Sequence, residues 1–148
     1  MTGASTTRTP TTGTPTPPLS STPPVQPARA ELGALTAVLE AEQAAVYGYG
    51  VVGGQVSPHH RARAAERLDW HSLNRDAVAA QLSLSGALTP PGPAAYALPF
   101  AVDDDETAQA LAAHLELGVA AAYADLVATS GPTRRAAAAE AQSGCAVA

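Results

Sequence analysis

The stretch LTAVLEAEQAAVYGY, Leu35–Tyr49, decides how this chain of 148 residues folds. Its large apolar side chains recur at steps of three or four residues, which is the period of a helix with one buried face. Glu42 lies on that face, and His71 lies on the apolar face of a second expected helix. A turn at Ser57-Pro58 separates them. Because each is about fourteen positions from the turn, antiparallel helices would place both at the same depth, roughly 20 Å from the bend.

The first helix is expected from about residue 28 to residue 55. Its buried stripe is Leu32, Leu35, Leu39, Glu42, Val46 and Tyr49. The later half also carries four glycines, at positions 48, 50, 53 and 54. Glycine weakens a helix, so these residues indicate either close approach of a neighbouring helix or early fraying.

The second helix has clear start and stop signals. Ser57 suits the N-cap, Pro58 suits the first helical position, and Gly86 suits the C-terminal end. Its apolar stripe is Ala64, Leu68, His71, Arg75, Val78 and Leu82. The other charged residues are expected on a solvated face: Arg61, Arg63, Glu66, Arg67, Asp69 and Asp76.

A proline-rich connection follows, from about residue 87 to residue 102. It is too long for a loop between two adjacent helices, and it is long enough to cross a bundle from end to end. Tyr96, Leu98 and Phe100 alternate with smaller residues, so we expect these three side chains to pack the connection against the helices.

The third helix is expected to begin in the acidic cluster at residues 103–106, where Asp103 and Glu106 have the spacing of a capping box. Its stripe is Leu111, Leu115, Val119, Ala122 and Leu126, with Glu116 and Tyr123 beside it. A turn at Ser130-Gly131-Pro132 precedes a short, alanine-rich fourth helix, from about 133 to 143. Short turn, long crossover and short turn predict an all-α, ferritin-like four-helix bundle over residues 28–146.

Residues 1–27 are almost wholly Thr, Pro, Ser, Gly and Ala. Such a segment buries too little apolar surface to offset its ordering entropy, so a disordered tail is expected. It lacks the apolar core of a secretory signal. We also expect no stretch of the chain to be long and uncharged enough to span a membrane. We therefore expect a cytoplasmic protein without a membrane partner.

Charge argues against nucleic acid as a partner. The formal net charge is -5, and the chain has neither a basic stripe nor a cluster of aromatic and basic residues. The single cysteine, Cys145, cannot form an internal disulfide.

Four stretches of this sequence resemble the actinobacterial ferritin-like proteins grouped as domain of unknown function 4439. These stretches are LEAEQAAVYGYGVVG (39–53), HSLNRDA (71–77), AYALPF (95–100), and Leu115-Glu116 followed by Ala122-Tyr123. The resemblance covers about residues 31–141. It implies a ferritin-like bundle and no established activity. The chain departs from the family at Gln43, where the family helix carries His, and in a fourth helix that ends early.

A ferritin-like di-iron centre takes a Glu from each of two helices and a Glu-x-x-His pair from each of the other two. Glu42 and Glu116 can serve for the first and third helices. The second offers His71 but has Leu68 three positions earlier, and the fourth offers Glu140 but has Ser143 three positions later. One acid and one imidazole are therefore missing. A site for iron or manganese built from Glu42, His71, Glu116 and Glu140 is kept as an alternative.

The leading interpretation is a buried polar network without a metal or other cofactor. Arg75 lies one turn from His71, and a buried guanidinium needs carboxylate partners. Glu42 and Glu116 would supply them, with His71 and Tyr123 completing the hydrogen bonds. The sequence thus predicts a non-enzymatic structural or interaction module with no catalytic residues. The thin fourth helix further predicts a homodimer that covers exposed apolar surface.

Overall fold

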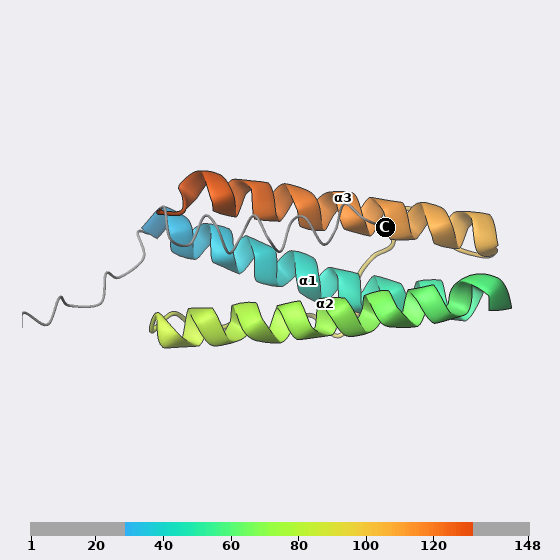
Figure 1. The fold of residues 1–148 in the computed structure, drawn as a ribbon, viewed down its shortest axis with the longest axis horizontal. Helices are drawn as coiled ribbons and strands as arrows, with labels where there is room; N and C mark the ends of the chain where they lie inside the picture. Colours follow the sequence, from blue (N-terminus) through green and yellow to red (C-terminus); the bar gives the residue numbers. More distant parts are fainter. Residues whose placement is uncertain (1–28, 132–148) are drawn as a thin grey trace, which may run out of the picture.

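The computed structural model describes residues 29–131, and this part of the chain is all α-helical (Figure 1). Its helices are α1 (Arg29–Gln55), α2 (Pro58–Leu84) and α3 (Asp105–Thr129). The prediction of an all-α protein is confirmed over these residues. The predicted tail at 1–27 and the predicted fourth helix at 133–143 lie outside the described residues.

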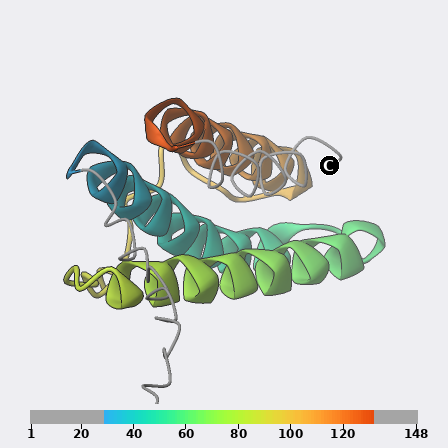
Figure 2. The same ribbon diagram turned by 60° about the vertical axis from the view of Figure 1, so that its left-hand side comes forward.

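Helix α1 is the shared partner of the other two helices. It runs antiparallel to both α2 and α3, so α2 and α3 run parallel to each other (Figure 1). Figure 2 shows α2 and α3 on different sides of α1. Within the described residues the backbone of α1 packs closely against α2 and against α3, whereas the backbones of α2 and α3 do not approach each other. Only side chains connect those two helices across the space between them.

The core follows the face of α1 that the sequence pattern predicts. Leu35, Leu39, Glu42 and Tyr49 are all buried. The other two helices contribute buried side chains at helical spacing: Ala64, His71, Val78 and Leu82 from α2, and Ala108, Leu111, Val119, Tyr123 and Leu126 from α3. The apolar part of this core excludes water from the polar side chains at its centre.

The ends of α2 match their sequence signals. Pro58 occupies the start of the helix, and Ser57 is at the N-cap, although the Ser57 side chain makes no capping hydrogen bond. Instead, the Ser57 N–H donates to Asp105 Oδ1 at 2.6 Å, so α3 caps α2. At the other end Gly86 has a φ of +72°, and the following N–H, of Ala87, donates to the Leu82 carbonyl. This is the Schellman arrangement in which glycine is favoured.

The start of α3 differs by one residue from the prediction. The N-cap is Asp104, whose carboxylate accepts the Thr107 N–H at 2.8 Å, while the Thr107 hydroxyl accepts the Asp104 N–H. The predicted capping pair of Asp103 and Glu106 is therefore wrong. A threonine hydroxyl reaches the N-cap backbone as the glutamate of a standard capping box does, and this allows the box to form one position later.

The connection between α2 and α3 crosses the bundle from end to end, as predicted (Figure 1). It is held against the outer side of α1 at two points. The Gln43 side chain donates to the Pro90 carbonyl at 3.1 Å, and the Tyr47 and Tyr96 rings lie 5.4 Å apart. Leu98 and Phe100 remain 36% and 40% exposed. Of the three side chains expected to pack the crossover down, only Tyr96 does so.

By length and composition alone, α3 could cross a membrane, and it is the one such helix among the described residues. The expectation that no segment meets this criterion is therefore too strict. The helices of a protein core meet it as well, and α3 packs along α1 through Ala108, Leu111 and Val119. Helix packing accounts for part of this apolar composition, since 22% of the apolar window is buried.

Gly48 is the glycine that permits close packing of α1 against α3. A Cβ at this position would lie 2.5 Å from Leu115 Cδ1. By contrast, a Cβ at Gly50, Gly53 or Gly54 would meet nothing within 4 Å. The prediction of close helix approach is thus correct at one of the four glycines. The predicted fraying does not occur, because α1 continues to Gln55.

We predict that Gly48→Ala lowers the free energy of unfolding relative to Gly50→Ala by about 1–2 kcal/mol, because the added methyl displaces Leu115. Gly50→Ala should itself stabilise the protein by about 0.5–1 kcal/mol, since alanine favours an exposed helix interior over glycine. Urea denaturation of the two variants and the wild type measures both effects. Equal stability of the two variants would contradict the close approach.

Candidate functional site

Glu42, in the middle of α1, is buried with no exposed surface. Its two carboxylate oxygens have separate partners on different helices. Oε2 lies 2.7 Å from His71 Nδ1 on α2, and Oε1 accepts a hydrogen bond from the Tyr123 hydroxyl on α3 at 3.0 Å. One side chain therefore connects all three described helices.

The imidazole of His71 lies between two carboxylates. Its Nδ1 faces Glu42, and its Nε2 lies 3.4 Å from Glu116 Oε1 on α3. The ring stacks on Tyr49 with centroids 5.1 Å apart, and the Trp70 ring meets it edge-on at 4.9 Å. Both in-plane nitrogens and the ring itself are thus enclosed by protein.

This arrangement favours the protonated form of His71. Burial lowers the pKa of the imidazole, but the hydrogen bonds to Glu116 and Glu42 outweigh burial, and the pKa is raised above its usual value. An imidazolium can donate from both nitrogens at once, which a neutral imidazole cannot do. A doubly donating His71 satisfies both carboxylates.

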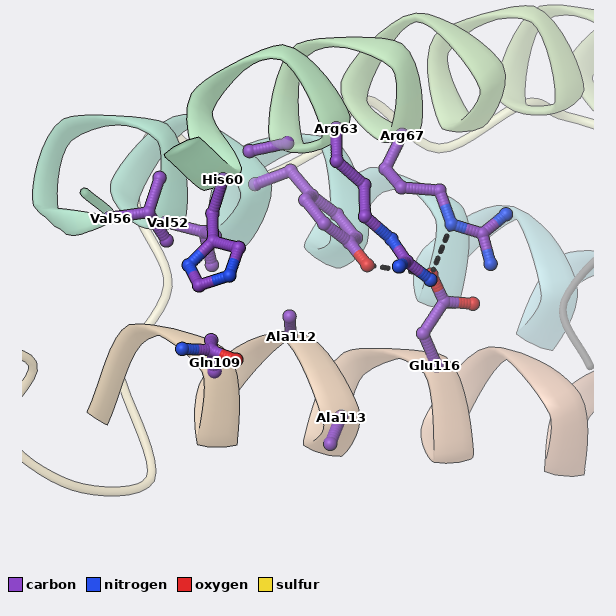
Figure 3. Close-up of a pocket in the computed structure, with 11 residues that line it drawn as sticks. Val52, Val56, His60, Arg63, Arg67, Gln109, Ala112, Ala113 and Glu116 are labelled. Carbon is purple, nitrogen blue, oxygen red and sulfur yellow. Dashed lines mark hydrogen bonds and ion pairs between the residues drawn. The ribbon is translucent and has the colours of Figure 1, made fainter. Parts of the chain in front are cut away.

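Three donor groups surround one carboxylate oxygen of Glu116. Its Oε1 lies 3.3 Å from Arg67 Nε (Figure 3). The same oxygen accepts a hydrogen bond from the Tyr49 hydroxyl at 2.6 Å, in addition to its contact with His71. Burial raises the pKa of Glu116, but His71, Tyr49 and Arg67 together hold it below its usual value. The same carboxylate, together with burial, raises the pKa of Tyr49. Glu116 is therefore ionised at neutral pH.

The other oxygen of Glu116, Oε2, is buried and has no hydrogen-bond partner among the described residues. It is part of an otherwise balanced group of charges. Glu42 and Glu116 supply two negative charges, and His71 and Arg67 supply two positive ones. Arg67 also lies over the Trp70 ring, 5.5 Å from the centroid. We call Glu42, His71, Arg67 and Glu116 the charge cluster; its formal charge is zero when His71 is protonated.

The sequence predicted Arg75 as the cation of this network, and that prediction is wrong. Arg75 instead pairs with its neighbour Asp76 at the surface, where its side chain is 35% exposed. Arg67, which was expected on the solvated face, pairs with Glu116, and the two side chains are each 14% exposed. The structure brings together Glu42, His71, Glu116 and Tyr123 from the predicted set, and Glu140 lies outside the described residues.

Helix geometry explains the exchange of the two arginines. Arg67 and Arg75 lie four residues before and after His71. Because successive residues rotate by about 100°, these positions fall on opposite flanks of the His71 stripe, about 80° apart. Helix α3 and Glu116 lie on the Arg67 flank. The sequence does not tell which flank α3 occupies, since that depends on the handedness of the helix arrangement.

Tyr49 is a second residue of the site that sequence reasoning missed. The sequence pattern placed Tyr49 on the apolar stripe of α1 and did not predict a hydrogen bond for its hydroxyl. The signal was its spacing, because it lies seven residues after Glu42 and therefore on the same face of the helix, two turns nearer the Ser57 turn.

The charge cluster does not fit a metal ion. Within residues 29–131, no group of three or more His, Cys, Asp or Glu side chains is arranged to hold one. Glu42 and Glu116 approach opposite nitrogens of His71, so the three potential donors point at one another instead of converging on a common point. The Arg67 guanidinium next to Glu116 would also repel a divalent cation.

Residues 34–148 match the family model described as "Domain of unknown function (DUF4439)". The match covers most of the chain, and the protein therefore belongs to this family. The structure is similar to the crystal structure of a conserved hypothetical protein, rv2844, from Mycobacterium tuberculosis. That similarity has a TM-score of 0.77 and 33% sequence identity, and it covers 80% of this chain and 84% of the other. Comparison with curated proteins gives no match.

We predict that the protein loses stability as the pH rises above neutrality. The folded protein binds the His71 proton more tightly than the unfolded chain does, because the folded-state pKa is raised. This contribution is therefore full below about pH 6.5 and is lost as the pH rises through the folded-state pKa. Chemical denaturation across this range measures the loss. The loss should disappear in His71→Gln and persist in His114→Gln, which changes an exposed residue on α3. An NMR titration of His71 showing an ordinary or lowered pKa would contradict this account.

We also predict that Arg67→Gln and Arg75→Gln differ strongly. Arg67→Gln leaves Glu116 short of its cation in a largely buried place and should lower the free energy of unfolding by about 2–3 kcal/mol. Arg75→Gln removes a surface pair and should change it by less than about 0.5 kcal/mol. Both are measured by urea denaturation at neutral pH, and the opposite ranking would restore Arg75 as the cation of the core.

Proposed function

We propose that this DUF4439 protein is a non-enzymatic structural or interaction domain, built as a ferritin-like bundle whose metal position is taken over by a charge cluster. The observation that carries the proposal is the place of the His71 ring, with one nitrogen on Glu42 and the other on Glu116. In a ferritin-like centre, carboxylates of this kind bridge metal ions. Here they bridge an imidazolium.

The arrangement of the described helices supports the ferritin-like part of the proposal. Helices α2 and α3 each neighbour α1 and do not neighbour each other. In a square of four helices that is the relation of two diagonal corners, which leaves the corner between them for a fourth helix. The end-to-end crossover between α2 and α3 is also the connection that distinguishes ferritin-like bundles from up-down-up-down bundles.

The full engagement of Glu42 and His71 supports a structural role. Both oxygens of Glu42 and both nitrogens of His71 have partners. The pKa values of His71 and Glu116 move in the directions that keep both groups charged. General acid–base catalysis needs a group that exchanges its proton near the working pH, and this set resists such exchange.

Exposed apolar side chains support an interaction role. Leu73 on α2 and Leu117 on α3 are 71% and 72% exposed. Leu84 and Leu88, at the end of α2 and in the crossover, are exposed even further. The homodimer stays a prediction, as do the cytoplasmic location and the absence of nucleic-acid and membrane partners.

An iron- or manganese-binding protein with redox or oxygen chemistry is the second candidate. It is favoured by the buried Glu116 Oε2, which has no hydrogen bond among the described residues. Glu140, the fourth carboxylate or imidazole of the predicted metal set, lies outside those residues. This candidate requires His71 to turn away from at least one of its two carboxylates.

Metal content tests the proposal directly. Protein purified without chelator is offered iron(II) or manganese(II) anaerobically, desalted, and analysed by plasma mass spectrometry. We expect no retained metal, because both oxygens of Glu42, both nitrogens of His71 and Glu116 Oε1 already have partners. Glu42→Gln and Glu40→Gln are measured in parallel, since Glu40 is an exposed acid on the same helix. Stoichiometric metal that is lost in Glu42→Gln and kept in Glu40→Gln would favour the second candidate.

A further inference from the structure

A cavity of about 320 Å³ lies between α2 and α3, over the last turns of α1 (Figure 3). It lies between the charge cluster and the end of the bundle that carries the Ser57 turn. Ligand sites for small molecules are typically concave and about 300–1,000 Å³ in volume. This cavity is at the lower end of that range, so it suits a small ligand.

The cavity has an apolar part and a polar part. Val52, Val56, Ala64 and Ala112 are among its lining residues, and in Figure 3 Val52 and Val56 lie towards the Ser57 end. The polar part is formed by Tyr49, Arg63, Arg67 and Glu116, and the labelled members of this group lie towards the middle of the bundle in Figure 3. A ligand that fills this space would need an apolar body and a polar group at one end.

The charges of the polar part determine whether the cavity favours an anionic or a cationic ligand. Glu116 and Arg67 already pair with each other. His60, at the other end, is engaged with Asp105 at 3.1 Å. Arg63 forms no ion pair or hydrogen bond with the residues that the structure describes. Within residues 29–131, its positive charge is therefore the one lining the cavity that has no counter-ion.

The position of Arg63 would allow its guanidinium to contact a ligand in the cavity. It is exposed on α2, and in Figure 3 its side chain extends from α2 towards α3 across the cavity. Its charge lowers the pKa of the Tyr49 hydroxyl, against the larger raising effects of burial and Glu116. The guanidinium thus lies near the hydroxyl that lines the polar part of the cavity.

We propose that this cavity binds a small organic anion, a carboxylate with an apolar or aromatic body. Arg63 holds the carboxylate through charge-assisted hydrogen bonds. The body of the ligand packs against the apolar residues on α1, α2 and α3. A cationic ligand would face Arg63 and Arg67 at short range, and a neutral one would leave the Arg63 charge unused. This inference does not depend on the proposed function, because Glu42 and His71, the other described metal candidates besides Glu116, do not line the cavity.

Three probes with one body and different charge test the proposal on the full chain. They are 4-phenylbutyrate, its neutral amide and the corresponding primary amine. Binding is followed by isothermal titration calorimetry and by NMR of alanine methyl groups. We expect 4-phenylbutyrate to bind at least about tenfold more tightly than the amide, as one charge-assisted hydrogen bond implies. The amine should not bind. The methyl groups of Ala112 and Ala113 should shift, and that of Ala124, exposed farther along α3, should not.

Two variants locate the two halves of the site. Arg63→Gln should reduce the affinity for 4-phenylbutyrate about tenfold and bring it to that of the amide. Arg61→Gln is the matched control, because Arg61 is an exposed arginine on the same helix that does not line the cavity. Ala112→Phe should fill the apolar part and abolish binding while Arg63 is intact. Circular dichroism and the thermal midpoint of each variant separate loss of binding from loss of the fold.

Three outcomes would overturn the proposal. One is equal binding of the carboxylate and the amide. Another is an equal effect of Arg63→Gln and Arg61→Gln, which would mean that the general surface charge attracts the anion. The third is the absence of any shift at the cavity methyl groups at millimolar 4-phenylbutyrate. If the metal analysis showed bound metal, each of these three outcomes could still be interpreted independently of that result.

Discussion

A carboxylate with no exposed surface must find all of its hydrogen-bond partners inside the protein, because an unpaired buried charge is strongly destabilising. Glu42 is such a group, and its partners come from α2 and α3. His71 can serve Glu42 as a charged donor only if a second carboxylate balances it, and Glu116 in turn requires Arg67 and Tyr49. The relative depth of the three helices is fixed by this sequence of requirements. A shift of one helix by a single turn would leave at least one charge buried without its partner.

The helical period and the capping signals in the sequence were enough to predict the three described helices and their order. The start of α2 at Pro58 and its end before Gly86 follow from local backbone preferences, and so does the crossover, whose length exceeds any hairpin loop. The depth of Glu42 and His71 follows from counting residues from the turn. The side on which α3 lies could not be obtained in this way, since Arg67 and Arg75 are equally close to His71 along the chain. The cavity was equally inaccessible, because it depends on how α2 and α3 are spaced around α1.

The two arginines near the cavity illustrate how one helix flank can serve two purposes. Arg67 pairs with Glu116, whereas Arg63, one turn earlier, lines the cavity and has no ion pair or hydrogen bond with the described residues. Both lie on the flank of α2 that faces α3. The charge cluster lies at the centre of the bundle, and the cavity adjoins it through Arg67 and Glu116.

The parallel direction of α2 and α3 has an electrostatic consequence at the end of the bundle where both begin. Each helix N-terminus carries roughly half a positive charge from its aligned peptide dipoles, and the C-terminus of α1 at the same end carries roughly half a negative one. The sum is close to half a positive charge, and Asp105, bonded to Ser57 and His60, supplies a negative charge beside it. Hydrogen bonds from Ser57 and His60 lower the pKa of Asp105 to about 2, so the carboxylate remains charged in all but strong acid. One aspartate thus acts as a common counter-ion for two helix dipoles, and it joins two segments that are 48 residues apart in the chain.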